Sequence, residues 1–313
     1  MKILCIGEAL IDMICTDKGK VLSDGEHFLK KPGGAPTNVA AAIAALGGEV
    51  ELSAKVGIDP FGKHLIDVMQ DFGVRTKHML QDAHHFTTFA FVSLMENGER
   101  DFYFNRGADG QLTAEEVDAI DLTDISIVHF GSATAFLPGT LQDAYVHLLK
   151  KAMEAKCFIS FDPNYRQLLF QNNKESFIAQ SWNFLEQCQF FKVSDEEALM
   201  LTDTVTVEEA TAVFHKKTNA VFAITIGKEG TMLGIRGETH IIPSIKITPV
   251  DTTGAGDAFT GAVLYQLRDQ TNKKLSIEDW KVIVTNGNKA GARTCEYLGA
   301  MEAFKHLSSD IFI

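Results

Sequence analysis

The sequence contains few cysteines, and their positions argue against two kinds of site. The five are odd in number, widely scattered and include no Cys-x-x-Cys pair: Cys5, Cys15, Cys157, Cys188 and Cys295. Neither a disulfide framework nor a zinc site is therefore indicated. Because this usage is typical of reducing compartments, we expect a cytoplasmic protein.

Long hydrophobic runs are also missing. The apolar segment 3–7 is followed at once by Glu8 and Asp12, so it is too short for the core of a signal peptide. The run 39–48 falls far short of the roughly 20 apolar residues that cross a bilayer as a helix. We expect no membrane partner.

Basic residues are outnumbered. The 29 Lys and Arg residues against 41 Asp and Glu residues give a net charge of −12, which repels a phosphate backbone, so no nucleic-acid partner is expected. A small anion such as a nucleotide is not excluded, because backbone N–H groups bind phosphate locally. The 45% hydrophobic content is enough for a large core and excludes disorder and fibrous repeats.

Short apolar runs alternate with helical patterns along the chain. The expected strands are 2–7, 49–56, 125–131, 157–162, 189–193 and 221–226. The expected helices are 37–46, 61–72, 140–155, 175–187, 208–216, 255–268 and 277–294. This alternation predicts an α/β fold with a mostly parallel sheet and helices on both faces.

Two stretches interrupt the alternation. Segments 86–94 and 100–105 indicate two strands joined through Asn97-Gly98, a dipeptide suited to a tight hairpin turn. Residues 12–31 also look extended. We interpret them as a small β-sheet that covers a site, although an ordinary surface hairpin fits the pattern equally well.

The strongest chemical signal is the segment 251–259, which continues into a helix. Free N–H groups and the helix dipole make the turn from Gly254 to Gly256 a favourable anion cradle. Asp257 follows in the first helical turn. It could simply cap the helix, but the glycines and the polar neighbours favour a general base beside a bound phosphate.

A second glycine-rich segment, 33–40, also opens a helix. Adjacent Gly33 and Gly34 allow close approach of a ligand to the backbone, and Asn38 offers both a donor and an acceptor. A plain junction between a loop and a helix explains this segment almost as well. The segment 251–259 is not a complete dinucleotide-binding fingerprint, since Phe259 replaces the third glycine and the segment lies late in the chain, and this argues against a nicotinamide oxidoreductase.

Together these two segments resemble the two signatures of the ribokinase-like sugar kinases, the phosphofructokinase-B family. Other segments resemble bacterial fructokinases: 7–12, 31–36, 56–62, 161–166 and 193–197. The resemblance implies one domain over 1–313, a Rossmann-like three-layer α/β/α sandwich with a β-sheet lid inserted from about 12–31 and 86–107. We also expect a homodimer formed through the lid, because an exposed lid sheet has free strand edges that favour pairing with a second chain.

The activity implied by the resemblance is ATP-dependent phosphorylation of a small sugar, with D-fructose to fructose 6-phosphate as the leading reaction. The alternatives in the family are ribokinase, 2-keto-3-deoxygluconate kinase and aminoimidazole riboside kinase. A non-catalytic, sugar-responsive binding protein is the alternative from another class. The intact Asp257 and the glycine cradle argue against that last reading.

The resemblance also assigns roles to individual residues. Asp257 would be the catalytic base, and the N–H groups of Gly254, Ala255 and Gly256 would stabilise the transferring phosphoryl group. The sugar-binding residues would be Asp12, Gly33, Gly34, Asn38, Arg106, Asn164 and Arg166. The ATP-binding residues would be Thr225, Gly227, Lys228, Gly230 and Asn288.

Two cation sites complete the implied set. Glu197 would act on Mg²⁺ through water, although Ser194 stands where many family members have Asn. Asp251 and Thr253 match a loop that binds a monovalent cation such as K⁺ in part of the family.

Overall fold

The computed structural model describes residues 1–95, 100–131 and 133–312. Its centre is a nine-stranded sheet that is parallel except for β12. In spatial order the strands are β13 (Glu238–Ile242), β12 (Thr231–Ile235), β11 (Val221–Thr225), β10 (Phe190–Ser194), β9 (Phe158–Asp162), β8 (Ile125–Gly131), β1 (Lys2–Ile6), β4 (Val50–Gly57) and β5 (Met79–Asp82).

Helices cover both faces of this sheet. Successive side chains of a buried strand point to opposite faces, so both faces must be covered. Ile3 and Cys5 of β1 belong to one core cluster, whereas Leu4 and Ile6 belong to another. The helices of the first cluster are α1 (Ala35–Ala45), α2 (Pro60–Phe72), α8 (Ala255–Leu267), α9 (Ile277–Thr294) and α10 (Ala300–Phe304). Those of the second are α3 (Ala114–Asp118), α4 (Thr140–Glu154), α5 (Lys174–Leu185), α6 (Asp195–Thr202) and α7 (Val207–Lys217).

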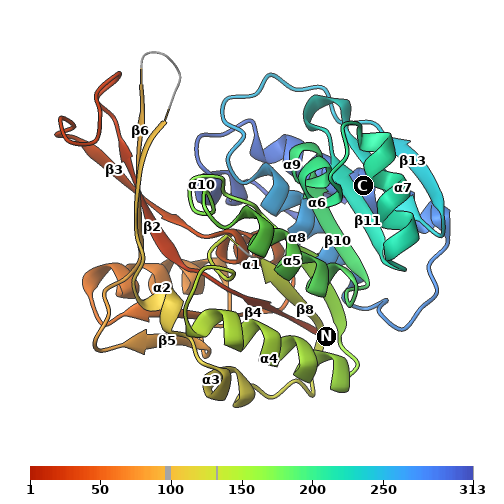
Figure 1. Ribbon diagram of the computed structural model, residues 1–313, viewed down its shortest axis with the longest axis horizontal. Coiled ribbons are helices and arrows are strands. Elements are labelled where there is room, and N and C mark those ends of the chain that lie inside the picture. Colours follow the sequence, from red (N-terminus) through yellow and green to blue (C-terminus); the bar gives the residue numbers. More distant parts are fainter. Residues whose placement is uncertain (96–99, 132, 313) are drawn as a thin grey trace.

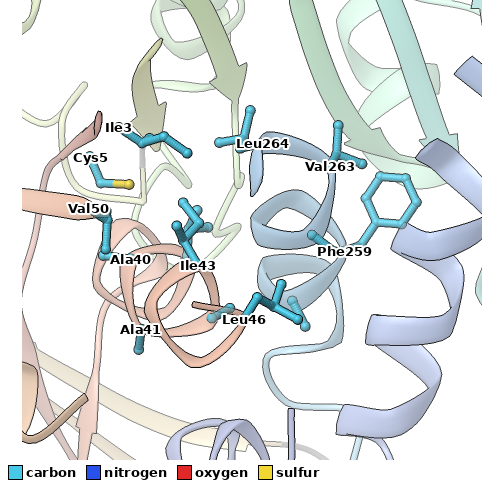
Figure 2. Packing of buried hydrophobic residues seen from close by; sticks show 14 of the residues in the cluster. Ile3, Cys5, Ala40, Ala41, Ile43, Leu46, Val50, Phe259, Val263 and Leu264 are labelled. Atoms are coloured by element: carbon cyan, nitrogen blue, oxygen red, sulfur yellow. The ribbon is translucent and has the colours of Figure 1, made fainter. Parts of the chain in front are cut away.

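Helices α1 and α8 pack closely against each other beneath the sheet (Figure 2). A Cβ atom on Gly261 would lie 2.8 Å from Cβ of Ala42, closer than side-chain atoms approach, so glycine permits this crossing. Ile43 of α1 points toward α8, whereas Phe259 points from the opposite side of α8 toward Gly287 of α9 (Figure 2). The close contact brings the N-terminal turns of both helices to one edge of the sheet.

A second, four-stranded sheet extends from the body at the upper left of Figure 1. Its strands, in spatial order, are β3 (Phe28–Gly33), β2 (Leu10–Cys15), β6 (Phe89–Leu94) and β7 (Arg100–Asn105). Phe89 of β6 packs edge-on against Phe61 of α2, with ring centroids 4.8 Å apart, and so joins the small sheet to the body. The expected turn at Asn97-Gly98 lies outside the described residues.

The predicted α/β fold and the second sheet are confirmed. Within the α/β alternation, the ends of the predicted strands and helices differ from the observed ones by two residues or fewer, whereas the strand predicted over 86–94 begins three residues later, at Phe89. The hairpin of β12 and β13 was missed, although its turn residues Arg236 and Gly237 have the positive φ angles, 52° and 82°, of a tight turn. The interpretation as one domain with a lid stays a prediction.

The short helices α3, α6 and α10 were also missed, although two of them begin with a recognisable capping box. These are α3, capped by Thr113 with Glu116, and α6, capped by Ser194 with Glu197. The described residues also include three 3₁₀ segments: η1 (Ala108–Gln111), η2 (Gly227–Glu229) and η3 (Ser309–Phe312). Within the described parts of the chain, no helix has the length and apolar character needed to cross a membrane.

Candidate active site

The candidate site lies where the parallel strands end. Glu8 follows β1, Asp162 ends β9 and Thr225 ends β11. The N-terminal turns of α1 and α8 face the same edge, since the first turn of α1 contacts that of α8 through a hydrogen bond. Open α/β sheets bind their ligands at this edge, beyond the carboxyl ends of the strands.

Asn38 and Asp257 meet between the two helices. Asn38 Nδ2 donates a hydrogen bond of 2.8 Å to Asp257 Oδ2, across 219 residues of sequence. Burial raises the pKa of Asp257 to about 6, and the nearby Asp162 adds to this effect. The Asn38 hydrogen bond, Lys192 and Arg166 act in the opposite direction. A carboxylate with such a pKa is well suited to accept a proton near neutral pH.

The turn before Asp257 depends on glycine. Gly254 has a φ of 81°, and a Cβ atom there would lie 2.4 Å from Cβ of Ala300. The N–H of Ala255 donates to the carbonyl of Thr252 at 3.2 Å, which closes the turn. The turn therefore places the first backbone groups of α8 at the edge of the sheet beside Asp257.

The diglycine turn lies against two carboxylate residues. A Cβ atom on Gly33 would lie 2.1 Å from Asp12 Oδ2, and one on Gly34, whose φ is 109°, would lie 2.3 Å from the carbonyl oxygen of Glu8. Burial raises the pKa of Asp12 to about 6, while Arg166 counteracts this shift. The glycines thus bring the backbone into contact with Asp12 at the start of α1.

Glu8 is a member of this group that the sequence analysis did not identify as functional. Its side chain is 0% exposed, and Oε1 accepts a 3.0 Å hydrogen bond from the N–H of Ala35. Oε2 is buried and has no hydrogen-bond partner among the described residues. Burial raises the pKa of Glu8 to about 7. The sequence signal that could have identified Glu8 is its position directly after a buried strand.

Arg106 is held at the base of the small sheet rather than solvated. Its Nη1 donates to the carbonyl of Pro138 at 2.6 Å, and its Nη2 donates to that of Thr134 at 3.0 Å. Nε lies 3.5 Å from Oδ2 of the buried Asp109. These contacts fix the guanidinium in one orientation.

Asn164 lies in the turn after β9. It adopts a φ of 48°, and its N–H donates to Asp162 Oδ1 at 3.1 Å. Its Nδ2 is buried without a hydrogen-bond partner in the described parts of the chain, so it is a donor available to a ligand. Arg166, two residues further, lies within electrostatic range of Asp12 and Asp257. Arg166 therefore lies close to the carboxylates beside both glycine-rich turns.

Glu197 connects this turn to α6. Its Oε1 accepts from the N–H of Tyr165 at 2.7 Å, and its Oε2 accepts from the N–H of Ser194 at 2.8 Å. Ser194 Oγ in turn accepts from the N–H of Glu197, so position 194 serves as the helix cap.

The expected nucleotide residues form a separate group at the β11–β12 connection. A Cβ atom on Gly230, whose φ is 115°, would lie 2.1 Å from the carbonyl oxygen of Ile242. Asn288 Oδ1 accepts from Thr231 Oγ1 at 2.7 Å, while its Nδ2 donates to the carbonyl of Ile242 at 3.2 Å. Its amide therefore ties α9 to β12 and β13. Gly227 and Lys228 lie exposed in the turn, next to Thr225.

The loop before α8 is organised by Asp251. Its Oδ1 accepts from both N–H and Oγ1 of Thr253, at 3.0 and 2.7 Å, and its Oδ2 accepts from the N–H of Gly299 at 2.8 Å. Within residues 1–95, 100–131 and 133–312, no group of three or more His, Cys, Asp or Glu side chains is arranged to hold a metal ion.

A cleft of about 470 Å³ lies at the other edge of the sheet, where the strands begin. Lys2, Glu51, Arg75 and Asp124 are among the residues that line it. Lys2 pairs with both Glu51 and Asp124, at 3.5 and 3.6 Å. The cleft does not coincide with the predicted site.

Comparison with known proteins identifies the family. Residues 1–306 match the model of the pfkB family carbohydrate kinases. The chain belongs to this family. Over 305 residues it is 34% identical to fructokinase-1 of Zea mays, a match that covers 96% of this chain and 93% of that protein.

Solved structures of this family share the fold. The fructokinase of Xylella fastidiosa with bound ATP is 29% identical, with a TM-score of 0.87 and coverage of 99% and 96% of the two chains. A double mutant of Vibrio cholerae fructokinase with fructose, ADP and a potassium ion is 28% identical, with a TM-score of 0.82 and the same coverage. The resemblance to ribokinase-like sugar kinases and the predicted fold class are thereby confirmed.

Proposed function

We propose that this protein transfers the γ-phosphoryl group of ATP to D-fructose and forms fructose 6-phosphate. The contact between Asn38 and Asp257 carries the proposal, because it joins the diglycine turn and the anion cradle in one site small enough for a sugar to bridge them. The fructokinase relatives support the choice of sugar.

In this reaction Asp257 accepts the proton of the attacking sugar hydroxyl. The amides of Gly254, Ala255 and Gly256 stabilise the charge on the phosphoryl group, since phosphoryl transfer depends mainly on positioning and electrostatic stabilisation. Asp257 suits this role because burial holds its pKa at about 6, so that the carboxylate is ionised at neutral pH and still basic.

The sugar is held on the side of the small sheet. Asp12, Gly33, Gly34 and Asn38 bind its hydroxyl groups, together with Arg106, Asn164 and Arg166. Nδ2 of Asn164 and Oδ1 of Asn38 have no hydrogen-bond partner among the described residues, and this supports the assignment, because buried polar atoms without a partner suit a polar ligand. Closure of the small sheet over the sugar would exclude water, which competes as the acceptor.

ATP binds at the β11–β12 connection, with Thr225, Gly227, Lys228, Gly230 and Asn288 around it. The residues fit a divalent ion held through water: both oxygens of Glu197 accept backbone N–H groups, and each keeps a second lone pair for a bound water. Mg²⁺ supplies charge neutralisation of the ATP phosphates there. The loop of Asp251 and Thr253 binds K⁺, a role supported by the potassium ion in the Vibrio cholerae structure.

The small sheet also forms the interface of a homodimer. Its outer strands β3 and β7 have unpaired edges, which favour pairing with another chain. Ile14 and Leu29 lie opposite each other on one face, 40% and 41% exposed. The protein works in the cytoplasm, a location consistent with five free, buried cysteines.

A panel of sugars in a coupled assay of ADP release tests this function. We expect turnover of D-fructose at a higher kcat/KM than of D-ribose, 2-keto-3-deoxygluconate or aminoimidazole riboside, and NMR of the product should show phosphate on O6. A higher kcat/KM for another of these substrates would reassign the kinase. No turnover of any sugar would support a sugar-responsive binding protein instead.

A further inference from the structure

Lys192 lies in the candidate active site without a role in the reaction described so far. It belongs to β10, and its side chain, 11% exposed, points to the sheet face covered by α8 and α9, the face of Phe190 two residues earlier. Its Nζ donates a hydrogen bond of 3.2 Å to Asp162 Oδ2. A buried ammonium group at this edge requires an explanation, because burying a charge costs free energy unless it is paired.

The ammonium group of Lys192 reaches the first turn of α8. A Cβ atom on Gly256 would lie 3.0 Å from Nζ and 3.5 Å from Cε. The positive charge is therefore adjacent to the backbone of the anion cradle. Glycine at position 256 leaves this space open, since any larger residue would place its side chain against Nζ.

The surrounding charges keep Lys192 protonated. Burial by itself lowers the pKa of this lysine, but Asp162, Glu197 and Asp257 together raise it above its ordinary value. In return Lys192 lowers the pKa of Asp257 and so favours the ionised base. Lys192 thus carries its charge at the pH at which Asp257 accepts a proton.

Pairing with Asp162 uses only part of the hydrogen-bonding capacity of Lys192. An ammonium group has three donors, and within the described residues one hydrogen bond, to Asp162, is present. A counter-ion for Asp162 alone would not need to lie against Gly256. Spare donors beside a backbone anion cradle are suited to the oxygens of a phosphoryl group.

We propose that Lys192 is a catalytic residue whose ammonium group contacts the phosphoryl group during its transfer from ATP to the sugar. The inference rests on the proposed kinase function. The bond between the γ-phosphorus and the bridging oxygen of ADP breaks, a bond to the sugar oxygen forms, and Asp257 takes the hydroxyl proton. Lys192 gains and loses no proton; its charge stabilises the oxygens of the group in transit.

Three variants test the proposal. Lys192→Met removes the charge at similar length and should lower kcat at least about a hundredfold, the scale of losing one transition-state donor, with the fructose KM changed less than about threefold. Lys192→Arg keeps the charge and should recover part of kcat. Lys192→Met combined with Asp162→Asn removes the unpaired carboxylate that the single variant leaves, and so protects the fold. Its kcat should stay as low as that of Lys192→Met.

Two outcomes would overturn the proposal. One is near-normal kcat in Lys192→Met. The other is recovery of kcat in the double variant, which would show that Lys192 serves only to neutralise Asp162. Circular dichroism and thermal unfolding of each variant confirm that the protein is folded.

A binding measurement separates this proposal from the kinase proposal. ADP with aluminium fluoride, Mg²⁺ and fructose mimics the phosphoryl group in transit, and calorimetry reports its affinity without turnover. The wild type should bind this mixture at least about tenfold more tightly than Lys192→Met does, the factor expected from loss of one charged hydrogen bond, whereas ADP alone should bind both equally. Equal affinities for the mixture would reject the role of Lys192, while a wild type inactive on every sugar would reject only the kinase function.

Discussion

Three buried carboxyl groups at the sheet edge share a raised pKa but differ in their partners. Glu8, Asp12 and Asp257 all have raised pKa values, and in each case burial is the largest cause. They differ in their partners: Asp257 has Asn38 and Lys192, while one oxygen of Glu8 has no hydrogen-bond partner among the described residues. These surroundings suit Asp257 to act as a base, whereas Glu8 favours its protonated form.

The role of Asp257 as a base can be tested by substitution. Asp257→Asn keeps the size of the side chain and its place beside Asn38 but cannot accept a proton. We expect kcat to fall at least about a hundredfold, the scale of general-base catalysis, with little change in thermal unfolding or in fructose binding measured by calorimetry. Turnover close to that of the wild type would remove Asp257 from the mechanism.

The pKa of Asp257 also predicts the pH dependence of the reaction. The carboxyl group is protonated below about pH 6 and cannot accept the hydroxyl proton in that form. The kcat/KM for fructose should therefore fall as the pH is lowered through about 6. A pH profile between 4.5 and 8 measures this limb, and a kcat/KM that stays constant as the pH is lowered through 6 would contradict the raised pKa.

The burial of Glu8 predicts a pH-dependent stability. Its pKa is about 7 in the folded protein against an ordinary value of 4.5, so the folded state binds the proton more tightly and stability falls as the pH rises from 4.5 to 7. The difference corresponds to about 3 kcal/mol. Relative to the wild type, Glu8→Gln should gain about this much unfolding free energy between pH 4.5 and 8. Urea unfolding at several pH values measures it, and parallel curves would contradict the prediction.

At the scale of elements, the crossing of α1 and α8 positions the site. The two helices approach closely because Gly261 lies against Ala42, and the same contact sets the distance between Asn38 and Asp257 at their N-terminal turns. Packing and catalysis therefore depend on one small residue near the middle of α8.

Substitution of Gly261 tests this dependence. The Cβ atom of Gly261→Ala would lie 2.8 Å from that of Ala42 and should force the helices apart. We expect a loss of about 1–3 kcal/mol of stability, as for other overpacked cores, and a lower kcat. Addition of Ala42→Gly removes the clashing atom and should restore much of kcat. Unchanged kcat and unfolding free energy in Gly261→Ala would contradict the argument.

At the scale of the whole molecule, the small sheet is the part least covered by the body (Figure 1). Its connection to α2 includes the packing of Phe61 against Phe89. Exposed apolar residues on a sheet with free edges favour association with a second chain.

The proposed dimer can be tested on Leu29. Leu29→Glu places a charge on the exposed face of β3 beside Ile14 and should weaken dimerisation at least about tenfold, since burying an unpaired charge costs more than 1.4 kcal/mol. Sedimentation velocity over a range of concentrations measures this. Leu168→Glu is the matched control, because Leu168 is similarly exposed, at 46%, but lies outside the small sheet. Equal sedimentation of both variants and the wild type would reject the interface.

The sequence by itself determined the elements and the chemical types of the site. Buried strands, helix starts and glycine turns follow rules that act over a few residues, so the α/β alternation, the segment 251–259 and the diglycine turn could all be recognised. The short helices capped by Thr113 and Ser194 carried such signals as well.

Only the tertiary structure decided which distant groups meet. Asn38 reaches Asp257 across 219 residues, and Lys192 lies against Gly256 from a different strand. The pKa of Glu8 likewise depends on its complete burial. Burial and electrostatic interaction are properties of the surroundings in space, and segments far apart in the chain supply those surroundings.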